Sequence, residues 1–413
     1  HDRDCISRLG LSLMNPASLR SIPSCDSPSS PASRINDIRC HPWVMDETQG
    51  THTLSLNNME LQSRETSIIS LLPCHRLVSH LAEVFFELVH PQIRVLHRPS
   101  FLSWIETGSY KSDSHSALLI LAISALAARF SDRPEVDLFD RMLLRDLSAD
   151  EVNQIDSHCK YSKRHERGKG FLSQASRHLH LEVLHMEMLE LEIGELQKPT
   201  IQFIQATLLL SFAEIGRALS SRAYSLVSMS IRLAYDCGLD QVDGRHNRRI
   251  TLLSSQRSDH RTEAAKKEEL RRAWWAISDM ENFVCTVKCR PRLIDWSKCK
   301  TQLPSDDEDW FEGGEVPSYF LPASIYDLHA SLDLPSRTSV MGNRILAMHL
   351  FAKLCYLAAN DDTVDGWHDP ISTIEECIAA WKPRMAQRVE SGQTAEPTGG
   401  LCDALIAYLV LQT

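Results

Sequence analysis

Apolar residues recur at helical spacing along most of this chain, and this periodicity is the strongest constraint on its fold. In the stretch CHRLVSHLAEVFFELVHP, Leu77, Leu81, Val84 and Leu88 fall at positions i, i+4, i+7 and i+11 and therefore share one face of a helix. No stretch alternates apolar and polar residues between turn signals, as a half-buried strand would. The sequence therefore predicts an all-α fold.

Capping residues add to this periodicity. Thr200 is suited to cap a helix that begins at residue 201, because its hydroxyl can accept a hydrogen bond from a free backbone N–H. Gly238 is suited to end the next helix, since glycine readily adopts the left-handed conformation of a C-terminal cap. A loop is expected over residues 91–101. The predicted helices cover residues 73–90, 115–130, 171–193, 201–215, 221–237, 264–288, 342–359, 370–390 and 400–412.

The composition indicates a globular protein, with 413 residues of which 43% are hydrophobic and 24% charged. A net charge of −10 argues against a general nucleic-acid-binding surface on this chain, because such surfaces are basic. The longest apolar run, ALLILAISALAA at residues 117–128, holds twelve residues and is too short to span a bilayer. We therefore expect a buried helix there and no membrane contact.

The twelve cysteines contain no Cys-x-x-Cys pair. Cys285 and Cys289 lie one helical turn apart, and Cys299 follows them. Zinc takes about four ligands, and no others lie within reach in the sequence. We expect reduced core cysteines of an intracellular protein and no metal in this chain.

Two regions are expected from the distribution of apolar residues. Residues 1–66 lack sustained periodicity, and NPASLRSIPSCDSPSSPASR at 15–34 is rich in serine and proline. Such a segment cannot bury enough apolar surface to order itself, so we expect a disordered linker or tail. Residues 67–413 are expected to form one large helical domain.

Two groups of possible ligand side chains could hold a metal. His178, Glu182 and His185 share a helix face, and Asp361, Asp362 and Asp365 have the spacing of the magnesium-binding motif of all-α terpene cyclases. No further ligand cluster accompanies either set. We expect an acidic loop for the aspartates and, for the histidines, a solvated face opposite an apolar stripe. That stripe consists of Leu181, Leu184, Met188 and Leu191.

No sequence pattern indicates an active site. The basic runs at 160–170 and 244–257 are expected to be solvated loops between helices. The Arg-Gly-Lys-Gly at 167–170 is not a phosphate-binding loop, because the glycine expected five residues before the Gly-Lys pair is missing. No Gly-x-Ser-x-Gly elbow is present either. The sequence therefore predicts no catalytic or cofactor-binding residue.

The stretch LRRAWWAISDMENF at residues 270–283 places two tryptophans side by side. Adjacent helical residues point about 100° apart, so Trp274 and Trp275 cannot share one narrow face. Both fit a helix that is buried over a broad arc, so we expect both indoles in the core. Arg271 and Arg272 are then expected to pair with acids of neighbouring helices. The broad apolar face comprises Ala273, Trp274, Ile277, Met280, Val284 and Val287.

Four segments within residues 80–310 carry a more specific signal. Residues 85–102 hold Val-His-Pro and then His-x-Pro-Ser-Phe, and residues 200–240 form a helical pair that ends in Gly-Leu. Residues 268–291 hold Arg-Arg-x-Trp-Trp followed by Arg-Pro, and residues 294–310 hold Leu-Pro-x-Asp-Asp. The motif residues are His90, Pro91, His97, Pro99, Phe101, Gly238, Leu239, Arg271, Arg272, Trp274, Trp275, Arg290, Pro291, Leu303 and Pro304.

In this order the segments resemble the fungal-specific transcription factor domain, the regulatory middle homology region of fungal binuclear zinc-cluster transcription factors. Cys289 stands where the family usually has glycine, and Tyr224 replaces a common tryptophan. The zinc cluster itself is absent from these residues. The chain begins with His1, so we expect a fragment whose zinc-binding, DNA-binding part lies upstream.

The resemblance implies a regulatory region of a nuclear transcription factor that controls RNA polymerase II transcription and is not an enzyme. Its implied partners are DNA through the missing domain, the transcription machinery or co-regulator proteins, a small-molecule effector and a second copy in a homodimer. Two alternatives stay open. One is a metal-dependent enzyme similar to terpene cyclases, and the other is a stand-alone helical regulator without DNA binding.

Overall fold

The computed structural model describes residues 68–145, 164–193, 198–244, 260–288, 290–313, 318–331, 333, 338–359 and 368–391, all within the unit that spans residues 65–413. Within these ranges the regular elements are helical, and β-type pairing is limited to an isolated antiparallel bridge between Gln302 and Phe320. The predicted all-α fold is confirmed. No helix in the described ranges has both the length and the hydropathy needed to cross a membrane.

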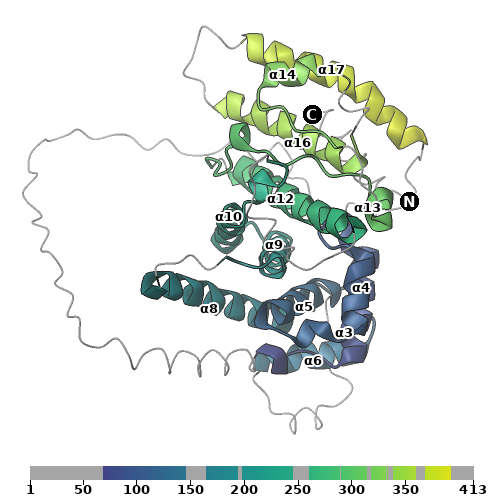
Figure 1. The fold of residues 1–413 in the computed structure, drawn as a ribbon, viewed down its shortest axis with the longest axis vertical. Coiled ribbons are helices and arrows are strands. Elements are labelled where there is room, and N and C mark those ends of the chain that lie inside the picture. Colours follow the sequence, from purple (N-terminus) through teal and green to yellow (C-terminus); the bar gives the residue numbers. More distant parts are fainter. Residues whose placement is uncertain are drawn as a thin grey trace, which may run out of the picture. The chain divides into compact units, whose positions relative to one another are not determined.

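The first group of helices surrounds α5 (Ser114–Ala127). Every residue of α5 from Ser116 to Ala127 is buried, which explains why this stretch is apolar all round rather than on one face. The helices that pack on it are α3 (His75–Leu88), α8 (Lys169–Ile193) and α9 (Ile201–Ile215). Two further helices, α4 (Arg98–Glu106) against α3 and α6 (Pro134–Arg145) against α8, complete this group (Figure 1).

The second group is built on α12 (His260–Lys288), which packs against α9, against α10 (Ser221–Asp236) and against α16 (Val340–Ala359). Two short helices, α13 (Asp307–Glu312) and α14 (Ile325–Ala330), lie between α12 and the last described helix, α17 (His368–Ser391), in the chain. α13 contacts α12, and α14 packs against α17 (Figure 1). Because α9 of the first group also packs on α12, α12 joins the two groups.

The predicted helix caps are present. The Thr200 hydroxyl accepts from the Phe203 N–H at 3.2 Å and so begins α9. Gly238 adopts φ of +71° just after α10. Asp113 caps α5 in the same way as Thr200, by accepting from the Ser116 N–H at 2.8 Å. These caps satisfy backbone groups that the helix itself leaves free.

Several boundaries differ from the expectation. The segment expected as a loop over 91–101 contains the short helix η2 (His90–Gln92) and the start of α4. α12 begins four residues before the predicted 264, at His260. Helix α6, of twelve residues, was not predicted. Helices α13 and α14 were not predicted either, because six residues carry too little periodicity to register. The predicted helix at 400–412 lies outside the described residues.

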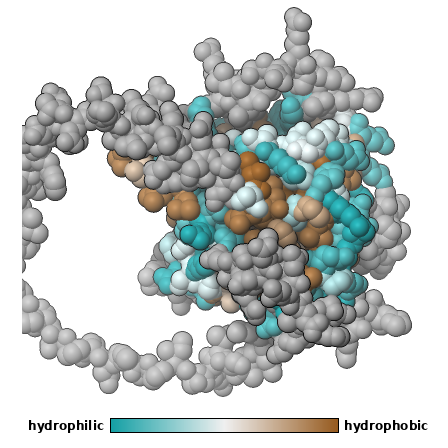
Figure 2. Space-filling model, turned by 90° about the horizontal axis from the view of Figure 1, so that it is seen from below, coloured by the Kyte–Doolittle hydropathy of each residue, from teal (hydrophilic) through white to brown (hydrophobic). Residues whose placement is uncertain are grey.

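The apolar stripe on α8 lies on the opposite side from where we expected it. Leu184, Met188 and Leu191 are 53%, 50% and 86% exposed, and Leu181 is exposed as well. On the other side of the helix, Leu179 is fully buried and Glu182 contacts α5 through His115. The expectation of a solvated histidine face opposite the stripe was wrong, because Glu182 of that face contacts α5 and the stripe itself is exposed. Figure 2 shows hydrophobic surface where α8 projects, on the left. Helical periodicity identifies an apolar face without identifying what covers it.

Candidate functional site: the buried ion-pair network of α12

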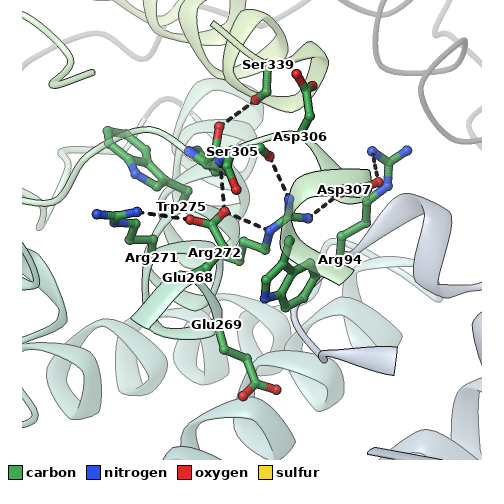
Figure 3. A network of polar contacts seen from close by, with 12 residues as sticks. Arg94, Glu268, Glu269, Arg271, Arg272, Trp275, Ser305, Asp306, Asp307 and Ser339 are labelled. Carbon is green, nitrogen blue, oxygen red and sulfur yellow. Dashed lines mark hydrogen bonds and ion pairs between the residues drawn. The ribbon is translucent and has the colours of Figure 1, made fainter. Parts of the chain in front are cut away.

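Arg272 of α12 lies at the centre of a network of polar contacts (Figure 3). Its side chain is fully buried, and each of its three nitrogens has an acceptor. Nε donates to the Glu268 carboxylate at 3.0 Å, and the terminal nitrogens donate to the Asp307 carboxylate at 2.5 Å and the Ser305 carbonyl at 2.7 Å. The guanidinium carbon also lies 4.0 Å from the centre of the Trp310 ring. A buried cation therefore joins α12 to α13 and to the segment before it.

Asp307 connects this centre to a third segment. Its second carboxylate oxygen lies 2.9 Å from a guanidinium nitrogen of Arg94, which is buried between η2 and α4. Burial alone would raise the pKa of Asp307, but the Arg272 and Arg94 guanidiniums outweigh it and hold that pKa below its ordinary value. The carboxylate therefore stays ionised between two cations.

Arg271, the residue before Arg272 on α12, binds Asp243 and Gln302. It binds the Asp243 carboxylate with two nitrogens, Nε at 2.9 Å and a terminal nitrogen at 2.6 Å, in the bidentate geometry that favours arginine over lysine. The same terminal nitrogen lies 2.7 Å from the Gln302 side-chain oxygen. Asp243 also accepts from the Gln302 backbone N–H at 2.9 Å. These bonds hold the segment around residue 302 along α12.

The tryptophans of this region are structural. Trp274 and Trp275 are 0% and 1% exposed, which confirms the prediction that both lie in the core. The Trp275 indole N–H donates to the Gln302 carbonyl at 2.6 Å, and the Trp310 indole N–H donates to the Ala265 carbonyl at 3.1 Å. Trp274 packs edge-on against Tyr235 of α10, with ring centres 5.4 Å apart. Aromatic burial and indole hydrogen bonds thus support the ion pairs.

His97, which precedes α4, connects the motif segment at residues 85–102 to the same network. Its backbone N–H donates to the Glu269 carboxylate at 3.1 Å, and its Nε2 lies 3.2 Å from the Trp310 carbonyl. Its Nδ1 lies 2.7 Å from the Ser100 hydroxyl. Burial is the main factor that lowers the pKa of His97. Each polar atom of this histidine therefore positions the corner between η2 and α4 against α12 and α13.

His90 and Phe101 form the apolar side of that corner. Burial lowers the pKa of His90 to about 3, so the ring is neutral, and its Nε2 lies 2.9 Å from the Leu96 carbonyl. Phe101 and His90 both pack on Phe86, with ring centres 5.5 and 4.9 Å away. Pro91 and Pro99 stand in the first turns of η2 and α4, where no helical N–H is needed.

The remaining motif residues lie around this centre or away from it. Leu239 and Leu303 are fully buried, and the Pro304 carbonyl accepts from the Ser339 hydroxyl at 2.6 Å. Arg290 and Pro291, in contrast, are exposed beyond the end of α12. Three of the four motif segments thus contribute side chains to one network. The helical pair at 200–240 supplies supporting contacts, including the bond from the Gln205 amide to the Val95 carbonyl at 2.9 Å.

Sequence reasoning did not find the acids that hold the two arginines. Glu268 lies on α12 itself, four residues before Arg272, a spacing that was visible in the sequence. Asp243 and Asp307 lie 28 and 35 residues away in sequence, and Arg94 lies still further off. The expectation that both arginines pair with acids of neighbouring helices was therefore right for Asp307 and missed Glu268.

The candidate metal sites gain no support. Glu182 lies 3.1 Å from Nε2 of His115, so its carboxylate is used in a contact with α5. In the described part of the chain no group of three or more His, Cys, Asp or Glu side chains is placed to hold a metal. Asp361, Asp362, Asp365 and Cys289 lie outside the described residues. Cys285 and Cys299 are free thiols, and burial raises the pKa of each to about 11.

The arrangement stabilises one packing of the domain. Removing one partner of a buried ion pair costs about 3–5 kcal/mol, because the other charge is left unpaired in the interior. Arg272 has two carboxylate partners, Glu268 and Asp307, and Asp307 is shared with Arg94. The contacts of α12, α13 and the η2–α4 corner are therefore coupled through one side chain.

The described part of the chain is a helical domain in which buried ion pairs join α12, α13 and the η2–α4 corner. The model of the family described as "Fungal specific transcription factor domain" matches residues 82–362, which is more than half of the chain. The chain belongs to this family.

The curated relatives are transcription regulators of fungi. A Zn(2)-C6 fungal-type transcription factor of Fusarium oxysporum is 25% identical over 56% of this chain and 18% of its own length. The positive regulator of purine utilization of Emericella nidulans is 24% identical over 68% of this chain and 27% of its own length. An uncharacterized transcriptional regulatory protein of Schizosaccharomyces pombe is 22% identical over 78% and 30% respectively. The chain thus spans less than a third of these relatives. No solved structure matches it significantly.

Proposed function

We propose that this chain is the regulatory region of a nuclear transcription factor that controls RNA polymerase II transcription. Residues 67–413 would form the regulatory domain, and residues 1–66 would link it to a zinc-cluster DNA-binding part upstream. The family match over residues 82–362 and the names of the relatives support this assignment. The net charge of −10 supports DNA contact by the upstream part rather than by this chain.

The observation that carries the proposal is the convergence of three motif segments on Arg272. A co-regulator protein or a small-molecule effector that displaced α13 would leave the Arg272 cation without its Asp307 partner, and one that displaced the η2–α4 corner would remove Arg94 from Asp307. The domain therefore favours one closed packing and resists partial opening. A regulatory region of this kind passes an input at one segment to the others through α12.

The test joins the full chain to a heterologous DNA-binding module in a yeast reporter strain. We expect transcription to change, in either direction, by at least about threefold relative to the module alone. Arg272→Met should abolish the change because it removes the cation shared by Glu268 and Asp307 and leaves each of these buried carboxylates with one cationic partner, Arg271 and Arg94 respectively. Arg290→Met, which alters an exposed arginine of the same motif, is the matched control and should keep the effect.

Two results would contradict the proposal. One is a fusion that is produced at normal levels yet leaves the reporter unchanged. The other is a transcript whose reading frame upstream of residue 1 reaches a start codon without a six-cysteine cluster, which would remove the zinc and direct DNA binding from the proposal. That second result would favour a stand-alone helical regulator.

A further inference from the structure

A cluster of buried polar atoms lies where α16 packs on α12 (Figure 1). His349 of α16 is fully buried, and neither of its ring nitrogens has a hydrogen-bond partner among the described residues. Its ring packs on Trp296 with ring centres 4.9 Å apart, and the Trp296 indole N–H is likewise buried without an acceptor among them. Buried polar side chains are almost always hydrogen-bonded, so groups left in this state indicate a partner that is not one of the described residues.

Helix α12 adds two more polar atoms to this interface. Trp275, Ser278 and Asn282 are spaced three and four residues apart, so they share one face of α12. Trp275 of this face packs on Trp296, with ring centres 5.5 Å apart. Ser278 and Asn282 are buried, and the Ser278 hydroxyl and the Asn282 side-chain oxygen have no hydrogen-bond partner in the described part of the chain. The face of α12 that meets Trp296 is therefore polar on the C-terminal side of Trp275.

Positive charge lies at the solvent side of this cluster. Lys353 follows His349 by about one turn of α16, so the two residues share a face, and Lys353 is partly exposed. Burial and then the Arg292 charge lower the pKa of Lys353, and no carboxylate of the described residues acts in the opposite direction. Arg292 is also partly exposed, and its charge acts on the Glu281 carboxyl as well. Of the two cations, Lys353 therefore lacks a counter-charge among the described residues.

The chemistry of these atoms defines the class of molecule that fits them. Burial lowers the pKa of His349 to about 3, so its ring is neutral and offers one N–H donor and one lone pair. The His349 and Trp296 N–H groups require an acceptor, and the Lys353 ammonium requires a negative charge. A carboxylate meets both requirements. The second His349 nitrogen and the α12 oxygens require a donor, and a hydroxyl supplies one without bringing another positive charge to Lys353 and Arg292, as an amino group would.

We propose that the interface between α12 and α16 binds a small hydroxy acid, with the carboxylate toward Lys353 and the hydroxyl toward Ser278 and Asn282. His349 and Trp296 donate to the bound acid from the buried side, and Lys353 supplies the charge that selects an anion. The inference concerns binding and does not depend on the regulatory function proposed above. Because its test uses the isolated chain, a negative result here and a negative result in the reporter strain are separate outcomes.

The test is isothermal titration calorimetry of the full chain with glycolate, the smallest hydroxy acid, in a chloride-free buffer. Glycolate should bind. Glycolamide has nearly the same shape without the charge, and glycine carries a positively charged amino group in place of the hydroxyl, so each should bind about tenfold more weakly or not at all. Inorganic sulfate that binds as tightly as glycolate would indicate an adventitious ion only and would overturn the proposal.

Two variants locate the binding. Lys353→Met removes the cation at a partly exposed position, and His349→Phe keeps a ring against Trp296 but removes both nitrogens. Each should weaken glycolate binding about tenfold or more, because each removes a hydrogen bond to a charged group. Lys111→Met is the matched control at an exposed lysine of η3 (Ser109–Lys111), and it should bind glycolate like the unaltered chain.

Thermal unfolding gives a second measurement of the same site. Glycolate should raise the melting temperature of the unaltered chain and of Lys111→Met, because a ligand that binds the folded state stabilises it, and should have less effect on Lys353→Met and His349→Phe. An unaltered chain that does not bind glycolate would overturn the proposal, and so would a Lys353→Met chain that binds it as tightly as the unaltered chain. Circular dichroism checks that each variant is folded, and Lys353→Met keeps the test decisive if His349→Phe is not.

Discussion

At the scale of single residues, the surroundings stabilise the charge of Arg272 and destabilise the charge of Glu269, three residues earlier on α12. Burial alone would lower the pKa of Arg272, but Asp307 and Glu268 raise it above its ordinary value, so this cation remains charged in the interior. Glu269, three residues before Arg272, points away from the network (Figure 3). Burial raises the pKa of Glu269 to about 7, although the His97 N–H and the Gln205 side chain act in the opposite direction. One carboxyl on this helix is therefore destabilising when ionised.

Glu269→Gln should increase stability at alkaline pH. The pKa of Glu269 is higher in the folded chain than in the unfolded chain, so the folded state binds this proton more tightly. Stability from this group is therefore present below the unfolded pKa of about 4.3 and is lost as pH rises through about 7. The amide oxygen of glutamine can still accept from the His97 N–H.

Thermal unfolding between about pH 4 and pH 8 measures this effect. The melting temperature of Glu269→Gln should equal that of the unaltered chain at about pH 4, exceed it increasingly up to about pH 7, and keep a constant excess above that. Glu263→Gln, at an exposed position in the first turn of α12, should follow the unaltered chain throughout. A difference between Glu269→Gln and the unaltered chain that does not vary with pH would contradict the assignment.

At the scale of elements, the start of α8 depends on a close approach to α6. The Asp140 carboxylate accepts from the backbone N–H groups of Gly168, Gly170 and Phe171 at 2.9, 2.8 and 3.1 Å. These are N–H groups that the first turn of α8 cannot satisfy itself. A Cβ at Gly170 would lie 1.9 Å from the Asp140 carbonyl oxygen. The glycines of the Arg-Gly-Lys-Gly stretch are thus required by helix packing.

Gly170→Ala should separate α6 from the start of α8 and lower the free energy of unfolding by about 1–3 kcal/mol, as overpacking in a dense interior does. Urea denaturation followed by circular dichroism measures the change. Gly216→Ala is the control, because a Cβ there would meet its nearest neighbour, the Phe212 carbonyl, at an ordinary 3.4 Å. Equal stabilities for the two variants would show that the approach at Gly170 is not restrictive.

At the scale of the whole molecule, α12 packs against helices that precede it in the chain and against a helix that follows it. α9 and α10 precede it and α16 follows it, with Arg344 of α16 2.5 Å from Asp279 of α12. His349 of α16 packs on Trp296, with ring centres 4.9 Å apart, and Trp296 packs on Trp275 at 5.5 Å. The domain is therefore expected to unfold as one cooperative unit.

A chain that ends at residue 331 lacks α16 and α17 and should lose this cooperativity. The apolar area that Ile345, Leu346 and Leu350 cover would be exposed, at a cost of about 25 cal/mol per Å². We expect a broader unfolding transition at lower temperature and increased binding of the dye ANS, relative to a control chain that ends at Ser391. The same melting temperature in both chains would show that α16 does not stabilise α12.

Local physical chemistry was sufficient to predict much of this protein from its sequence. Helix formation and capping depend on contacts within about four residues, so the all-α fold, the Thr200 cap and the Gly238 stop could be read directly. The burial of Trp274 and Trp275 followed from the breadth of their apolar face. The Arg272–Glu268 pair also had a local signal, in its four-residue spacing.

Only the tertiary structure decided which distant groups meet. The sequence marks Asp243 and Asp307 as acids, but their choice as partners of Arg271 and Arg272 depends on how the segments after η5 (Leu239–Gln241) and at α13 return to α12. The exposure of the α8 stripe was likewise not predictable. The spacing of Leu184 and Met188 places them on one face but does not say whether another helix covers that face. Periodicity defines a face of a helix from its neighbours in sequence, whereas burial is defined by neighbours in space.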